Sequence, residues 1–174
     1  EYAGGLYGYT GSGRYMLVNH VTVSGSDYTS GVYGLYAHTN ANNCLLENSV
    51  ISGANYVSGY VGKRYYDIDY SNLGVYNCSI TATGNYAGGI FAQIEPRSIY
   101  RCYVSHTDVK AQNYAGGLAA ELRCGRVYGC EIGADVTASQ AAGGLAGRMY
   151  SYLYDAGSPS SYPYTTLFRN IVAG

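Results

Sequence analysis

Asn113-Tyr114-Ala115-Gly116-Gly117-Leu118 is a phrase that returns along the whole chain at intervals of 26 to 30 residues. Its copies predict six units that start near residues 1, 27, 55, 85, 113 and 140. Self-similarity at such a period is typical of a solenoid, in which one unit cannot bury its apolar face alone and stacking supplies a continuous core. The sequence therefore predicts a single repeat domain over residues 1–174.

Each unit carries a second phrase, whose first and sixth residues are aliphatic in every copy: Val18–Val23, Leu46–Ile51, Val75–Ile80, Ile99–Val104, Val127–Ile132 and Leu167–Val172. An aliphatic frame around small and polar residues suits a short strand, and the paired glycines interrupt any helix. A third strand is visible only in the fourth and fifth units, as Asp108–Ala111 and Asp135–Ala138. The predicted fold class is all-β, a β-solenoid (β-helix) of about six coils with 26–30 residues per coil.

The composition is unusual, with 25 Gly, 23 Tyr, 47% hydrophobic and only 12% charged residues. Apolar residues that recur at fixed positions argue against disorder. The net charge of −1 lacks the basic footprint of a nucleic-acid-binding protein, so no nucleic-acid partner is expected. No stretch approaches the roughly 18 consecutive apolar residues of a membrane span, so none is predicted.

Stacked coils place equivalent residues about 4.7 to 4.9 Å apart, so each alignment column becomes a ladder. One ladder joins the amides of Asn55, Asn85 and Asn113, which can hydrogen-bond side chain to side chain. Another stacks the rings of five tyrosines: Tyr2, Tyr28, Tyr56, Tyr86 and Tyr114. Both ladders are predicted to serve packing and turn stabilisation.

A second tyrosine column is predicted from Tyr76, Tyr100 and Tyr128. Each follows an inward aliphatic residue, so strand alternation points it outward. An exposed aromatic strip of this kind serves either as a platform for glycans or a cell surface, or as a seam between neighbouring solenoids. Plain strand propensity is the competing explanation.

Cys78, Cys102 and Cys130 are predicted to share one column that faces the coil interior. A buried cysteine behaves as a small hydrophobic residue, which is the structural role expected here. Adjacent coils also allow a Cys78–Cys102 or Cys102–Cys130 disulfide. Cys124 and Cys130 lack metal-ligand spacing and the three histidines are scattered, so no metal and no cofactor are expected.

The largest insertion runs from Arg148 to Thr166 as a long side loop in the last coil, and it contains Tyr152 and Tyr154. It is expected either to cover a coil edge or to form a contact surface for a glycan or a partner, since loops on rigid scaffolds carry recognition.

Sequence signatures of enzymes are absent, so no catalytic residues are predicted. Asp67 and Asp69 come closest to a paired-carboxylate site, as a Ca²⁺ contact or a solvated turn.

The unit formed by Ile99–Val104, Val109–Ala111 and Asn113–Leu118 resembles the GLUG-type repeats of bacterial surface and adhesin-like proteins. The chain departs from that pattern by Ala92 and Ala120, where a closing glycine is usual, and by its excess of tyrosine. The resemblance implies a β-solenoid exposed outside a cell, serving adhesion or surface structure. It implies no catalytic residues.

The two ends of the chain are in phase, because Val172-Ala173-Gly174 would lead directly into Glu1-Tyr2-Ala3-Gly4-Gly5. Neither end resembles a polar capping repeat, so open strand edges are expected to associate. The residues expected at these edges are Tyr2, Gly4, Gly5, Leu6, Ile171 and Val172.

The sequence favours a non-catalytic extracellular structural protein, a homopolymeric filament or fibre subunit or an adhesin stalk. The first alternative is a carbohydrate-binding β-helix that uses its outward tyrosines. A more remote alternative, by analogy of fold, is a polysaccharide-cleaving β-helix enzyme.

Overall fold

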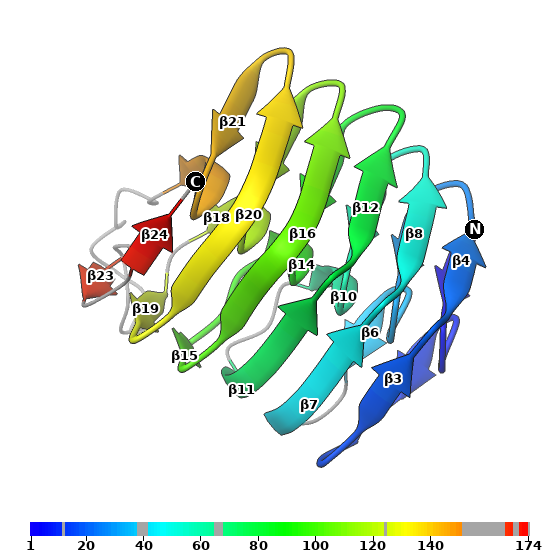
Figure 1. The fold of residues 1–174 in the computed structure, drawn as a ribbon, viewed down its shortest axis with the longest axis horizontal. Coiled ribbons are helices and arrows are strands. Elements are labelled where there is room, and N and C mark those ends of the chain that lie inside the picture. Colours follow the sequence, from blue (N-terminus) through cyan, green and yellow to red (C-terminus); the bar gives the residue numbers. More distant parts are fainter. Residues whose placement is uncertain are drawn as a thin grey trace, which may run out of the picture.

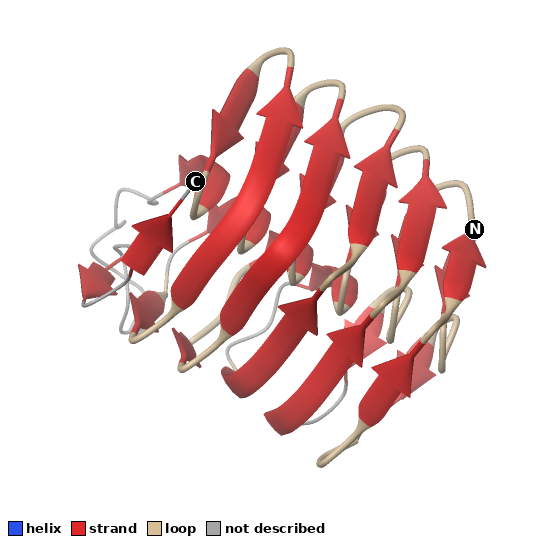
Figure 2. Ribbon diagram, in the orientation of Figure 1, coloured by secondary structure: helices blue, strands red, loops and turns tan. Residues whose placement is uncertain are grey.

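The computed structural model describes residues 1–11, 13–37, 42–64, 68–123, 125–150, 166–168 and 171–173. Within these ranges the chain is all-β and contains no helix. Its parallel sheets stack as a β-solenoid of about five turns, with successive coils side by side along the long axis (Figures 1 and 2). The predicted fold class is confirmed.

Three larger sheets run along the solenoid, and every strand pairs in parallel with the equivalent strand of the next coil. The first, here called the narrow sheet, consists of β1 (Tyr2–Gly4), β5 (Tyr28–Ser30), β9 (Tyr56–Ser58), β13 (Tyr86–Gly88), β17 (Tyr114–Gly116) and β21 (Ala141–Gly143). The second, the back sheet, consists of β10 (Val61–Arg64), β14 (Phe91–Ile94), β18 (Ala119–Arg123) and β22 (Ala146–Tyr150).

The third, the broad sheet, faces the viewer in Figure 1. Its strands are β3 (Leu17–Asn19), β4 (Thr22–Ser24), β7 (Asn42–Glu47), β8 (Val50–Gly53), β11 (Asp69–Tyr76), β12 (Ser79–Ala82), β15 (Ser98–Tyr100), β16 (Tyr103–Ala111), β19 (Arg126–Tyr128), β20 (Glu131–Ala138), β23 (Thr166–Phe168) and β24 (Ile171–Ala173). A fourth, two-stranded sheet pairs β2 (Thr10–Gly11) with β6 (Tyr36–Ala37).

Two columns of residues with positive φ bend the broad sheet. The first corner contains Tyr15, Asn43, Asn72, Arg101 and Gly129. The second corner contains His20, Asn48, Asn77 and His106. Asparagine and histidine tolerate this left-handed conformation better than most residues, which explains their recurrence here. In β20 no residue matches His106, and the register shifts between Ser105 and Thr107.

The core is a set of inward columns that are almost fully removed from solvent. One column on the broad sheet contains Val18, Leu46, Val75, Val104 and Ile132. Tyr60, Tyr70 and Phe91 are among the largest fully buried side chains, and the rings of Tyr70 and Phe91 pack edge to face at 4.9 Å. Alternation of side chains along each strand produces this pattern.

Paired glycines allow the sharp exit from the narrow sheet to the back sheet. A Cβ on Gly88 would collide with the carbonyl oxygen of Phe91, and one on Gly116 with that of Ala119. In these coils the first glycine of the pair marks a backbone approach that leaves no room for a side chain, whereas Ser30 and Ser58 occupy the same column in the second and third coils.

The predicted alignment of the second phrase is wrong. Its copies in the first three units lie at a different corner of the coil from its copies in the last three. Val18–Val23, Leu46–Ile51 and Val75–Ile80 span the second corner, because Val75 pairs with Val104 and Ile80 with Val109. Ile99–Val104 and Val127–Ile132 span the first corner. The third strand is consequently present in the early coils too, as β4, β8 and β12.

Candidate functional site

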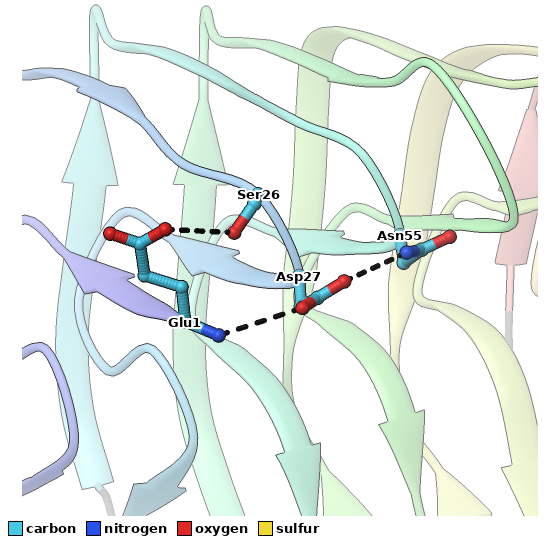
Figure 3. Close-up of polar contacts among 4 residues, drawn as sticks. All are labelled: Glu1, Ser26, Asp27 and Asn55. Atoms are coloured by element: carbon cyan, nitrogen blue, oxygen red, sulfur yellow. Dashed lines mark hydrogen bonds and ion pairs between the residues drawn. The ribbon is translucent and has the colours of Figure 1, made fainter.

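The amide ladder on the narrow-sheet side forms as predicted. Asn85 Nδ2 donates to Asn55 Oδ1 at 2.8 Å, and Asn113 Nδ2 donates to Asn85 Oδ1 at 2.5 Å. The ladder continues to Asp27, whose Oδ1 accepts from Asn55 Nδ2 at 2.8 Å (Figure 3). That hydrogen bond is the main cause that lowers the pKa of Asp27, with help from the Glu1 ammonium 3.5 Å from Asp27 Oδ2. Ser26 Oγ donates to Glu1 Oε2 at 3.3 Å.

The first tyrosine ladder is also confirmed, with ring centroids 4.9 to 5.4 Å apart from Tyr2 to Tyr114. Cations from the back sheet lie against it. Lys63 Nζ is 4.9 Å from the ring centroid of Tyr56, and Arg148 Cζ is 5.2 Å from that of Tyr114. These contacts join two sheets, so the ladder serves packing.

The prediction of a second tyrosine column is wrong, because the three tyrosines lie at different corners. Tyr100 pairs with Tyr128, and their rings stack at 5.3 Å. Tyr76 instead pairs with Ser105 and packs edge to face on His106 at 5.3 Å. Tyr76 and Tyr128 are both exposed, at 41% and 39%. The three tyrosines therefore do not form one continuous strip.

The prediction that the three cysteines share one column is wrong for the same reason. Cys78 lies beside Thr107, whose Oγ1 accepts from the Cys78 backbone N–H at 3.3 Å. Cys102 follows the first-corner residue Arg101, and only Cys130 of the predicted set shares its column. Leu73 and Cys44 are earlier members of that column.

The four described cysteines are buried, so their predicted small, buried role is confirmed. Burial raises the pKa of the Cys78 and Cys102 thiols. The register excludes a Cys78–Cys102 bridge, and Cys102 and Cys130, although adjacent in one column, are both thiols.

The predicted acidic pair and side loop fall largely on residues outside the described ranges. Asp67, Tyr152 and Tyr154 lie there, and of the loop only Arg148 to Tyr150 are described, as the end of β22, with Thr166 at the start of β23. Asp69 pairs with Arg97 at 3.5 Å. Among the described residues, no group of three or more His, Cys, Asp or Glu side chains could hold a metal ion.

The predicted edge residues lie on the outermost strands. Tyr2 and Gly4 belong to β1, which among the described strands pairs with β5 only, and Gly5 donates its N–H to Ser30 O at 3.1 Å. Leu6 is 49% exposed and Tyr2 is 43% exposed. Ile171 and Val172 lie in β24, for which β20 is the one partner among the described strands, and nothing is described of their side chains.

A polar groove follows the outside of the second corner, and the sequence did not reveal it. It has a volume of about 530 Å³, and its lining includes His20, Asn48, Asn77, His106, Asp108 and Asp135. Asn48 Nδ2 donates to Asn19 Oδ1 at 3.0 Å, and Asn77 Nδ2 donates to Asn48 Oδ1 at 2.8 Å. The sequence pattern that marks this corner is an Asn or His just before a small inward residue. That pattern alone does not show which of its copies stack on one another in successive coils.

No family model, no curated protein and no solved structure matches the sequence. The resemblance to GLUG-type repeats therefore stays a prediction. None of the described residues forms a helix that is long and apolar enough to cross a membrane.

Proposed function

We propose that the chain is a non-catalytic structural protein outside the cell, a subunit of a surface filament or fibre or the stalk of an adhesin, which assembles when the end faces of its solenoid stack on another copy. The observation that supports this proposal is the state of the first coil. Leu6 heads a column whose next four members, Val32, Tyr60, Ile90 and Leu118, are fully buried.

The same coil exposes further large apolar side chains, among them Tyr15 at 81% and Leu17 at 63%. Among the described strands, β1, β3 and β4 pair with strands of the second coil only. An apolar strand edge of this kind is a template for further parallel pairing. Contact between unlike ends of identical subunits does not close, and it yields a filament.

The carbohydrate-binding alternative, in its predicted form, needed Tyr76, Tyr100 and Tyr128 in one strip. The register assigns Tyr76 to another corner, so that form of the alternative is withdrawn. Polysaccharide cleavage stays an untested prediction that the glycan experiment below also addresses.

Assembly is tested by sedimentation velocity and negative-stain electron microscopy over a protein concentration series. Leu6→Lys places a charge at the head of the core column, where stacking would bury it. We expect this variant to raise the concentration needed for assembly at least about tenfold, the equivalent of about 1.4 kcal/mol.

Tyr103→Lys is the control, because Tyr103 is 38% exposed on β16, away from both end faces. It should assemble like the unmodified chain. The proposal fails if the unmodified chain remains monomeric throughout the series, or if Leu6→Lys assembles as readily as the control. The proposed location is tested separately, by antibody labelling of intact, unpermeabilised source cells.

A further inference from the structure

The second-corner groove is the feature of the molecule that the assembly proposal leaves unused. It runs along the solenoid axis, since its lining comes from successive coils, from His20 in the first to Asp135 in the fifth. Four intervals at the usual strand spacing give it a length of about 19 Å. A groove of this shape suits an extended polymer better than a compact small molecule.

The groove offers neutral hydrogen-bonding side chains and two carboxylates. Asn48, Asn77 and the imidazoles of His20 and His106 can both donate and accept hydrogen bonds. Asp108 and Asp135 are the acidic members of the lining, and Asp108 Oδ2 lies 3.4 Å from Lys110 Nζ. Paired donors and acceptors of this kind match the hydroxyl groups of a sugar, each of which also does both.

The backbone around the groove argues against a peptide ligand. Asn48 N–H donates to Tyr76 O at 3.1 Å, Val50 N–H to Val21 O at 2.9 Å, and Ser79 N–H to Ser49 O at 2.9 Å. Strands β8, β12 and β16 of the second to fourth coils pair with neighbours on both sides, so the middle of the groove offers no edge for strand addition. Nucleic acids and acidic glycans are disfavoured because their anionic groups would meet Asp108 and Asp135.

An exposed aromatic ring stands at the margin of the groove. Tyr76 immediately precedes Asn77, is 41% exposed, and is held edge to face by His106 at a centroid distance of 5.3 Å. A tyrosine ring combines an apolar face with a polar tip, which suits the mixed surface of a sugar ring.

We propose that the second-corner groove binds a linear, neutral, hydroxyl-rich glycan that lies along the solenoid axis. The side chains of His20, Asn48, Asn77 and His106 hydrogen-bond its hydroxyl groups, and Tyr76 packs against one sugar ring. Binding in this groove is independent of end-to-end assembly, because the groove lies on the side of the stack.

The test is calorimetric titration with neutral linear hexasaccharides of glucose, xylose, mannose and N-acetylglucosamine, and with hexagalacturonate as the acidic comparison. The protein is kept below its assembly concentration, so the result does not depend on filament formation. At least one neutral hexasaccharide should bind, and hexagalacturonate should bind more weakly. Recovery of shortened sugar would overturn the non-catalytic part of the proposed function, and mass spectrometry of the recovered probe detects it.

Tyr76→Ala and Tyr128→Ala form a matched pair, because the two tyrosines are almost equally exposed, and Tyr76 packs on the groove residue His106 whereas Tyr128 packs on Tyr100. Tyr76→Ala should weaken binding at least tenfold, and Tyr128→Ala less than twofold. Ser79→Phe, which fills the groove from its half-buried wall, supplies an independent variant if Tyr76→Ala does not fold by circular dichroism. The proposal is overturned if no neutral probe binds or if the acidic probe binds more tightly. It is also overturned if Tyr76→Ala and Tyr128→Ala bind the neutral probe with the same affinity. Where Ser79→Phe replaces Tyr76→Ala, equal affinities of Ser79→Phe and Tyr128→Ala have the same meaning.

Discussion

At the scale of single residues, cysteine and serine perform the same local task at the corners. Cys44, Cys78, Cys102 and Cys130 each directly follow a residue with positive φ. Each Sγ approaches the carbonyl oxygen two residues earlier, as in Cys78 to Tyr76 at 3.2 Å. Ser49 Oγ makes the equivalent bond to Glu47 O at 2.6 Å. A small inward side chain with a weak donor thus satisfies a carbonyl next to the bend.

Buried tyrosines should make the protein sensitive to alkali. Burial raises the pKa of Tyr33 to about 12, and it also raises the pKa values of Tyr60 and Tyr70. Above pH 10 the unfolded chain releases these protons while the folded chain keeps them. The free energy of unfolding should therefore be steady to about pH 9 and then fall by up to about 1.4 kcal/mol per pH unit for each such tyrosine.

Urea unfolding between pH 7 and pH 11 measures this slope. Tyr33→Phe removes one of the titrating phenols and should reduce the slope above pH 10. An unfolding free energy that does not change between pH 9 and pH 11 would contradict the burial of these hydroxyl groups.

At the scale of elements, the ladders fix each turn to the next. Asn85 connects Asn55 to Asn113 and precedes β13, so its amide both donates and accepts along the stack. Asn85→Ala removes both bonds from a half-buried position. It should lower the free energy of unfolding by about 1 to 3 kcal/mol.

The matched control for this prediction is Thr83→Ala in the same turn. Thr83 is exposed, and its Oγ1 makes a single bond to Gly53 O at 3.4 Å. The control should change the free energy of unfolding by less than about 0.5 kcal/mol. Equal losses for the two variants in urea would mean that the ladder adds nothing beyond the turn itself.

At the scale of the whole molecule, stability should vary along the stack. Each coil contacts only its neighbours, so an end coil receives support from one side. Strand β1, which contains the exposed Tyr2 and is followed by the exposed Leu6, pairs with β5 only among the described strands, whereas β13 lies between β9 and β17. Local opening should therefore be easiest at the first coil.

Amide hydrogen exchange followed by mass spectrometry tests this expectation. Under conditions that keep the protein monomeric, residues 2–7 should exchange at least about 100-fold faster than residues 86–94. Uniform protection from the first coil to the fourth would indicate one cooperative unit and contradict the expected gradient. Under assembling conditions, protection of residues 2–7 should rise if their face is covered.

The repeat alone determined much of this fold. Period, glycine pairs and aliphatic alternation act over a few residues, so the parallel coils, the Asn55–Asn85–Asn113 ladder and the tyrosine ladder from Tyr2 to Tyr114 could be predicted. The tight exit at Gly88 and Gly116 follows from the same local signal.

Only the tertiary structure decided which residues meet between coils on the broad sheet. Cys78 and Cys102 occupy the same local motif, an aliphatic residue and a tyrosine before a bend, but at two different corners. Local sequence cannot distinguish these corners, because both require the same backbone conformation and the same small inward side chain. Inter-coil hydrogen bonding sets the register, and that register separates Tyr76 from Tyr128 and brings His20, Asn77 and Asp135 to one groove.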